Sequence, residues 1–202
     1  MSQIALPLKA GRDGPQRIVI GAANIQVAEA LANPESWPFR TAVLTGPPRS
    51  GKSLFASWFQ QTGKGMALDD AQKLLEDEVF HCWNRAQQNG EPLLIVAGEP
   101  PWEIVLPDLK SRLGAALQLE IGTPDDELAG ELLLSLAQER ALPLGPEAVD
   151  YLIPRMNRSW QDIEKLVEMI DRLSLERKSP PTLGIWRSAL GAVHGPEEPR
   201  LL

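Results

Sequence analysis

Apolar and polar positions follow two different patterns along this chain. Between Arg17 and roughly Ile121, short apolar runs alternate with stretches of helical spacing, as in a parallel β-sheet covered by helices. The strand candidates are Ile18–Ile20, Ala42–Leu44, Met66–Leu68, Leu93–Val96 and Leu117–Ile121. We therefore predict an α/β core over residues 17–122.

From Thr123 onward the apolar spacing is wholly helical. Thr123-Pro124-Asp125-Asp126 reads as a helix start, with Thr123 as N-cap, proline at the first helical position and acids in the first turn. The predicted helices are Leu128–Arg140, Pro146–Met156, Ser159–Arg177 and a short Leu183–Val193. We expect a small helical subdomain over residues 123–193 and a tail over 194–202.

The first sixteen residues lack sustained periodicity and contain two glycines and two prolines, which predicts a flexible arm over residues 1–16.

Composition narrows the class of protein. The chain has 202 residues with 43% hydrophobic content, enough for a proper core. The single cysteine, Cys82, cannot form an internal disulfide, and no apolar run is long enough to span a membrane. Met1 is not followed by a basic and then an apolar segment, so we expect no secretory signal and a cytoplasmic protein. A net charge of −7 argues against direct binding of this chain to a DNA duplex, because affinity for the phosphate backbone comes mainly from Lys and Arg.

The strongest candidate site fits the pattern G-x-x-x-x-G-K-[ST] and lies between a predicted strand and the predicted helix Leu54–Gln61. Gly46 and Gly51 let backbone N–H groups turn inward toward phosphate oxygens, and the following helix adds its positive end. Lys52 would reach the β- and γ-phosphates, and Ser53 would hold Mg²⁺. We predict binding of ADP or ATP. The nucleotide-binding residues of the loop would be Gly46, Pro47, Pro48, Arg49, Ser50, Gly51, Lys52, Ser53 and Leu54.

A second candidate element is the apolar run Met66–Leu68, which ends in two acids. Asp69 would complete the Mg²⁺ shell, and Asp70 could orient or deprotonate an attacking water. Asp70 could also open a helix over Ala71–Glu78, and the two roles are compatible.

The phosphate loop, the strand ending in two acids and the helical C-terminal module together resemble the AAA+ ATPases. Arg17–Leu31, with Val19-Ile20-Gly21 and Asn24, resembles the segment that lies against the adenine in DnaA-type initiators. Leu106–Leu113 is similar to their Box VII motif, in which the arginine after serine, here Arg112, acts on a neighbour's nucleotide. Gln3–Leu8 resembles the Q-L-x-L-P-L clamp-binding motif of the Hda-type regulatory inactivators of DnaA.

The resemblance to the Hda type, in its alphaproteobacterial form, runs from Gln3 to about Leu190. It implies an AAA+ core with a helical lid. It also implies that the bound nucleotide is ADP, as expected for a regulator, and that Arg112 acts in trans as an arginine finger. It also implies two partners, the DNA polymerase III sliding clamp and DnaA, with a homodimer as a further option. The implied clamp-binding residues are Gln3, Ile4, Leu6, Pro7 and Leu8. No basic helix-turn-helix pattern follows the last predicted helix, so we expect a regulator without sequence-specific DNA binding.

The chain departs from the pattern of the family at three places. Only a short segment separates Lys52 from Asp69, so the second strand of the sheet should be missing. Gly98, beside Glu99, stands where initiators place a polar sensor, and glycine has no side chain to bond a γ-phosphate. Gln161 aligns with the sensor-2 arginine, although Arg158, three residues earlier on the same helix face, could substitute. We therefore expect nucleotide binding without efficient hydrolysis by this chain alone.

Two alternatives stay open at the level of sequence. One is a self-contained P-loop ATPase or small-molecule phosphotransferase, since such loops also occur in nucleotide kinases. The other is a nucleotide-locked adaptor that stimulates nothing. Trp37-Pro38-Phe39 could pack near the base or brace the chain. The tryptophans at helical apolar positions, expected in the core or an interface, are Trp58, Trp83, Trp160 and Trp186.

Overall fold

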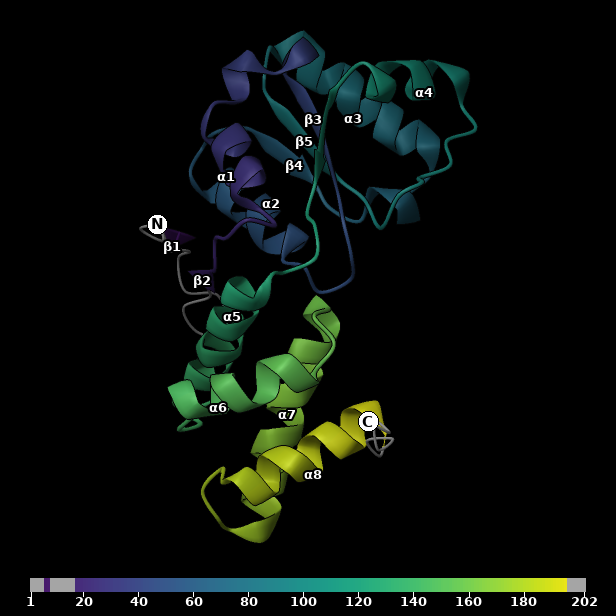
Figure 1. Cartoon of the computed structure of the whole chain (residues 1–202). Helices are drawn as coiled ribbons and strands as arrows, with labels where there is room; N and C mark the ends of the chain where they lie inside the picture. The colour runs from purple at the N-terminus through teal and green to yellow at the C-terminus, as the bar shows by residue number, and fades with distance from the viewer. Residues whose placement is uncertain (1–5, 8–16, 196–202) are drawn as a thin grey trace. The chain divides into compact units, whose positions relative to one another are not determined.

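The computed structural model describes residues 6–7 and 17–195, and the chain divides into two compact units after Gly122 (Figure 1). The first unit holds all strands of the described residues, and the second holds helices only. The division agrees with the change from strand-like to helical spacing in the sequence.

The first unit is built on a four-stranded parallel sheet in the order β4-β5-β3-β6. Its strands are β3 (Thr41–Thr45), β4 (Met66–Leu68), β5 (Leu93–Val96) and β6 (Leu117–Glu120). Strand β3 is central, because it pairs with β5 on one side and β6 on the other. The predicted α/β class with a parallel sheet is confirmed.

Helices cover both faces of this sheet (Figure 1). They are α1 (Ile25–Ala32), α2 (Lys52–Gln61), α3 (Glu76–Asn89) and α4 (Pro107–Gly114). Val43 and Ile95 belong to the buried cluster on the α3 and α4 side. Successive strand residues point to opposite faces, so Leu44 and Leu94, also fully buried, face the other layer. Burial on both faces explains why β3 and β5 contain continuous apolar runs.

The connection from α2 to β4 is a short turn, and β4 pairs within the sheet with β5 alone. The prediction that the second strand is missing is therefore confirmed.

The apolar run Ile18–Ile20 does not join the sheet, so that prediction was wrong. Strand β2 (Arg17–Ile18) instead pairs antiparallel with β1 (Leu6–Pro7). The buried side chain of Asn24 accepts from the Gly21 backbone N–H and donates to the Val19 carbonyl, each at 2.9 Å. These bonds bend the chain into α1 before the run can extend.

Trp37 contacts both α1 and α2 and braces them against each other. Its ring stacks on Phe59 with centroids 5.3 Å apart, and its Nε1 donates to the Ala30 carbonyl at 2.9 Å. These contacts support the bracing role for Trp37, whereas Phe39 is 60% exposed. The tryptophans predicted to be in the core, Trp58, Trp83, Trp160 and Trp186, are buried.

The second unit is an all-helical module with its own core. Its helices are α5 (Asp126–Glu139), α6 (Pro146–Leu152), α7 (Trp160–Arg177) and α8 (Leu183–His194). Leu133, Leu166 and Ile170 are fully buried in this core. Within the part of the chain that the structure describes, no helix has the length and apolar character needed to cross a bilayer.

Two helix boundaries of this unit differ from the prediction by more than one residue. The N-cap of α5 is Asp125 rather than Thr123, and its carboxylate accepts from the Leu128 backbone N–H at 2.8 Å. Helix α6 ends at Leu152 and continues as a 3₁₀ turn over Ile153–Arg155. Pro154 explains the early end, because proline has no N–H to continue the α-helical bonding.

Candidate functional site

The predicted phosphate loop lies at the carboxyl edge of the parallel sheet, directly after the central strand β3. The Gly46 backbone N–H donates to the carbonyl of Gly98, beyond the end of β5, at 3.3 Å. On the other side, the N–H of Ile121 donates to the Thr45 carbonyl at 3.0 Å. The loop therefore starts between the ends of two neighbouring strands, where ligands bind in open α/β sheets.

Two positions in the loop require glycine. A Cβ at Gly46 would lie 2.9 Å from the carbonyl oxygen of Ile121, which is backbone and cannot move aside easily. Gly51 has a φ of 86° and stands immediately before α2, so its backbone adopts a left-handed conformation that favours glycine. Both glycines thus serve the shape of the loop, as the sequence predicts.

The side chain of Lys52 folds back onto the backbone of the phosphate loop. Its Nζ donates to the carbonyl oxygens of Gly46 and Pro47, both at 2.7 Å. Burial lowers the pKa of Lys52, while the carboxylates of Glu99, Asp69 and Asp70 act in the opposite direction. The structure thus brings the acids that follow β4 and β5 into the field of this ammonium group.

The serines of the loop have different surroundings. Ser50 is 2% exposed, and its hydroxyl has no hydrogen-bond partner among the described residues. A buried hydroxyl without a partner is costly, and a phosphate oxygen would satisfy it. Ser53 is exposed at the start of α2. The loop therefore fits an anion, with a hydroxyl and an ammonium group available to it.

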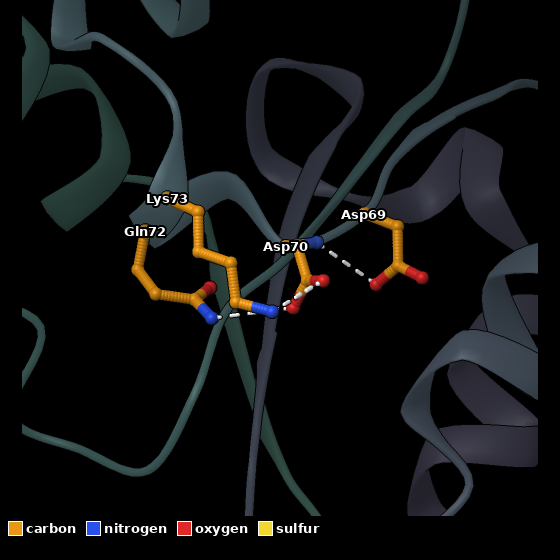
Figure 2. Close-up of polar contacts among 4 residues, drawn as sticks. All are labelled: Asp69, Asp70, Gln72 and Lys73. Atoms are coloured by element: carbon orange, nitrogen blue, oxygen red, sulfur yellow. Dashed lines mark hydrogen bonds and ion pairs between the residues drawn. The ribbon is translucent and has the colours of Figure 1, made fainter.

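The oxygens of Ser53 and Asp69 are of the kind that Mg²⁺ takes in proteins, where it keeps waters and nucleotide phosphates as its other ligands. Asp69 is exposed at the end of β4, and its Oδ1 accepts from the Asp70 backbone N–H at 2.9 Å (Figure 2). The donor chemistry of this pair therefore fits a magnesium nucleotide.

Asp70 is held by its own neighbours, as Figure 2 shows. Its carboxylate accepts from Lys73 Nζ at 2.8 Å and from Gln72 Nε2 at 3.3 Å. The bond from Lys73 is the main reason that the pKa of Asp70 is lowered. The lowered pKa makes the Asp70 carboxylate a weaker base, which suits orienting a water better than taking its proton.

The predicted helix over Ala71–Glu78 is absent. Ala71–Lys73 forms a 3₁₀ turn, and α3 begins only at Glu76. Asp70 has a left-handed backbone with a φ of 52°, and its side chain bonds Gln72 and Lys73 instead of capping a helix. The acids of the first turn of α3, starting with Glu76, favour a helix start there.

Arg112 lies in the last turn of α4 and packs against α3. Its guanidinium carbon is 4.8 Å from the ring centroid of Phe80 and 4.3 Å from that of Trp83. Its Nη1 donates to Oδ1 of Asn84 at 3.2 Å. Contacts of this kind with aromatic faces are worth about 0.5–2 kcal/mol each. The guanidinium is therefore held in one place on the core.

The start of α4 is fixed by α3 as well. The carboxylate of Glu76 accepts from the backbone N–H groups of Val105 and Leu106 at 2.8 and 2.6 Å. Leu106 is the N-cap of α4 and Pro107 its first residue. Both ends of the helix that carries Arg112 are thus tied to α3.

The residues that align with the sensors of the family lie in different units, Gly98 in the first and Arg158 and Gln161 in the second. A Cβ at Gly98 would lie 3.7 Å from Nε2 of Gln72, so the amide of Gln72 is beside this glycine. Arg158 and Gln161 belong to the second unit, where Arg158 forms an ion pair with Asp126. The roles of Arg158 and Gln161 at a nucleotide stay predictions.

The implied clamp-binding segment falls mostly outside the described residues, which do not include Gln3, Ile4 and Leu8. Of this segment, the structure describes the backbone of Leu6–Pro7 in β1.

Sequence reasoning missed Gln72, Phe80 and Asn84. The one signal for Gln72 is its place two residues after the acid pair. Phe80 and Asn84 have no such signal, since α3 reads as an ordinary amphipathic helix.

Comparison with curated proteins finds replication initiators. The chain is 28% identical over 120 residues to the chromosomal replication initiator DnaA of Bacteroides thetaiotaomicron, a match that covers 54% of this chain and 25% of that protein. It is 25% identical over 134 residues to DnaA of Thermomicrobium roseum, covering 62% of this chain and 28% of DnaA. An uncharacterized protein of Haemophilus influenzae is 25% identical over 133 residues, covering 62% and 58%. The chain thus spans about a quarter to three-fifths of the length of these relatives. No protein-family model matches it.

Comparison with solved structures gives the fold. Domain III of Thermotoga maritima DnaA matches with a TM-score of 0.71 at 13% identity, covering 88% of this chain and 95% of that one. DnaA bound to AMPPCP and single-stranded DNA matches with a TM-score of 0.60 at 18% identity, covering 79% and 65%. The AAA domain of FIGL-1 in complex with ADP matches with a TM-score of 0.61 at 14% identity, covering 89% and 84%. The chain therefore has the AAA+ fold, in the form seen in DnaA domain III.

Proposed function

We propose that this chain is a nucleotide-binding regulator of replication initiation that stimulates ATP hydrolysis by DnaA. Sequence similarity to DnaA and the shared fold support a place in replication initiation. Nucleotide binding is supported by the loop geometry and by DnaA structures that hold AMPPCP. The result of the activity would be conversion of DnaA–ATP to its ADP form.

The phosphate loop binds the nucleotide in this proposal. Its backbone N–H groups and the Lys52 ammonium hold the phosphates, and the Ser50 hydroxyl gains the partner that it lacks. Ser53 and Asp69 hold Mg²⁺, which supplies neutralisation of phosphate charge.

The observation that supports an action of Arg112 on the nucleotide of DnaA is the fixed position of its guanidinium. It is stacked on two aromatic rings and uses one N–H for Asn84. A guanidinium has five N–H donors, and the bond to Asn84 uses one of them. Because the side chain is already ordered, little rotamer entropy is lost when it engages. Arginine fingers supplied in trans raise GTPase rates by about 10³–10⁵.

The N-terminal segment joins the regulator to the DNA-loaded sliding clamp in this proposal. Gln3 offers an amide to a polar pocket, and Leu6 and Leu8 offer aliphatic anchors in a groove. The clamp then supplies the DNA contact, which a chain with a net charge of −7 is poorly suited to make.

The decisive experiment measures ATP turnover by DnaA with and without this chain, in the presence of DNA-loaded clamp. The unaltered chain should accelerate turnover, and Arg112→Ala should lose the acceleration while keeping ADP and clamp binding. Arg112→Lys should rescue poorly, because a point charge lacks the planar fork and the stacking of a guanidinium.

Arg85→Ala is the matched control, since Arg85 is an exposed arginine of α3. It should stimulate as well as the unaltered chain. Full stimulation by Arg112→Ala would show that the finger assignment is wrong. Rapid ATP turnover by this chain alone would instead favour a self-contained ATPase.

A further inference from the structure

Gln72 lies next to the phosphate loop although the loop motif does not include it. Its Nε2 and Cδ are 3.7 and 3.8 Å from the position that a Cβ at Gly98 would take. The carbonyl of Gly98 accepts from the N–H of Gly46, the first residue of the loop, at 3.3 Å. Glu99, the next residue, is near enough to Lys52 to raise its pKa against the effect of burial. The amide of Gln72 therefore lies in contact distance of the place where a side chain at position 98 would begin.

The surroundings of Gln72 leave it a donor for an anion. Its Nε2 donates one bond to Oδ1 of Asp70 at 3.3 Å (Figure 2). An amide nitrogen carries two N–H donors, so a second remains. The Asp70 carboxylate forms an ion pair with Lys73 at 2.8 Å, which offsets the repulsion that it would exert on a phosphate.

We propose that Gln72 supplies to the terminal phosphate of a bound nucleoside triphosphate the hydrogen bond that Gly98 cannot supply. This inference rests on the proposed nucleotide site and deepens it. ADP has no such phosphate, so the contact makes the site distinguish a triphosphate from a diphosphate. Gln72 is thus a specificity-determining residue contributed by the turn after β4.

The test measures the affinities of the full chain for ADP and for AMPPCP, a non-hydrolysable triphosphate, by titration calorimetry with Mg²⁺. Gln72→Ala should weaken AMPPCP binding about 10- to 100-fold, as expected for one hydrogen bond to a charged group, and leave ADP affinity within about threefold. Gln88→Ala, at an exposed glutamine of α3, is the matched control and should change neither affinity.

A second variant restores an amide donor from the segment that follows β5. Gly98 does not have a left-handed φ, and the nearest atoms to its added Cβ belong to the Gln72 side chain. Gly98→Asn in the Gln72→Ala background should therefore fit and recover most of the AMPPCP affinity.

The outcomes separate this inference from the proposed function. If the unaltered chain binds neither nucleotide, the nucleotide site fails and the inference fails with it. If it binds both and Gln72→Ala weakens them equally or not at all, the role of Gln72 is overturned while the site stands. Selective loss of AMPPCP binding, with recovery in the double variant, supports the inference.

Discussion

At Lys52, burial and charge act in opposite directions. Burial lowers the pKa of the ammonium group, and three nearby carboxylates partly offset this. The unfolded chain holds this proton more tightly, so between the lowered folded pKa and the ordinary value the free energy of unfolding rises with pH. A bound phosphate favours the charged form and raises the pKa again.

Lys52→Ala should remove the charge while keeping the loop backbone, so ADP affinity should fall about 10- to 100-fold. Thermal stabilisation by ADP, which at 100 times Kd is worth about 2.7 kcal/mol, should then fall to about 0.4–1.4 kcal/mol at the same ADP concentration. Differential scanning fluorimetry measures this directly.

Lys64→Ala is the control, because Lys64 also donates to a backbone carbonyl, that of Ala32, but lies outside the loop. It should keep the ADP shift. An unchanged shift in Lys52→Ala would show that the loop is not the site. In the unaltered chain, ADP affinity should start to fall at a lower alkaline pH than an ordinary lysine would give.

At the scale of elements, α3 has two roles. Its buried face, which includes Val79 and Ala86, packs on the sheet. Its neighbouring face binds the guanidinium of Arg112 through Phe80, Trp83 and Asn84. One helix thus belongs to the core and also positions the proposed finger.

The start of α5 gives a test of the helix boundary. Asp125→Ala removes the side chain that accepts from the Leu128 N–H, and should lower the free energy of unfolding by about 1 kcal/mol. Thr123→Ala should cost less than about 0.5 kcal/mol, since Thr123 is exposed and does not cap the helix. Urea unfolding followed by far-UV circular dichroism measures both. A larger cost for Thr123→Ala would place the helix start where the sequence alone puts it.

At the scale of the whole molecule, the proposed function depends on the N-terminal segment Gln3–Leu8, which lies mostly outside the described residues. Replacing Gln3, Leu6 and Leu8 together by alanine should abolish association with the clamp, because the amide and both aliphatic anchors are lost. Surface plasmon resonance on immobilised clamp measures this association.

The same triple variant should keep its melting temperature and its ADP binding, because the pairing of β1 with β2 that the structure describes involves two residues of each strand. Ser2→Ala with Lys9→Ala, outside the proposed motif, is the control and should bind the clamp normally. Full clamp affinity in the triple variant would place the binding surface elsewhere.

The phosphate loop and the acid pair could be predicted because their signals are local. Gly46–Ser53 needs only a strand before it and a helix after it, and both are visible in the apolar pattern. The missing strand was also predictable, because chain length between Lys52 and Asp69 limits what can fold there. The exclusion of Ile18–Ile20 from the parallel sheet could not be predicted. Its apolar pattern does not reveal the hydrogen bonds of the Asn24 side chain that turn the chain.

The sequence by itself determined the fold class, and it predicts a change of architecture near residue 122 and the central residues of the candidate site. Only the tertiary structure decided that Gln72 lies beside Gly98 and that Arg112 lies on Phe80 and Trp83. Those contacts join segments that are distant in the chain, through the pairing of β4 with β5 and the packing of α4 on α3. Periodicity reports which face of an element is buried, but not which distant residue it meets.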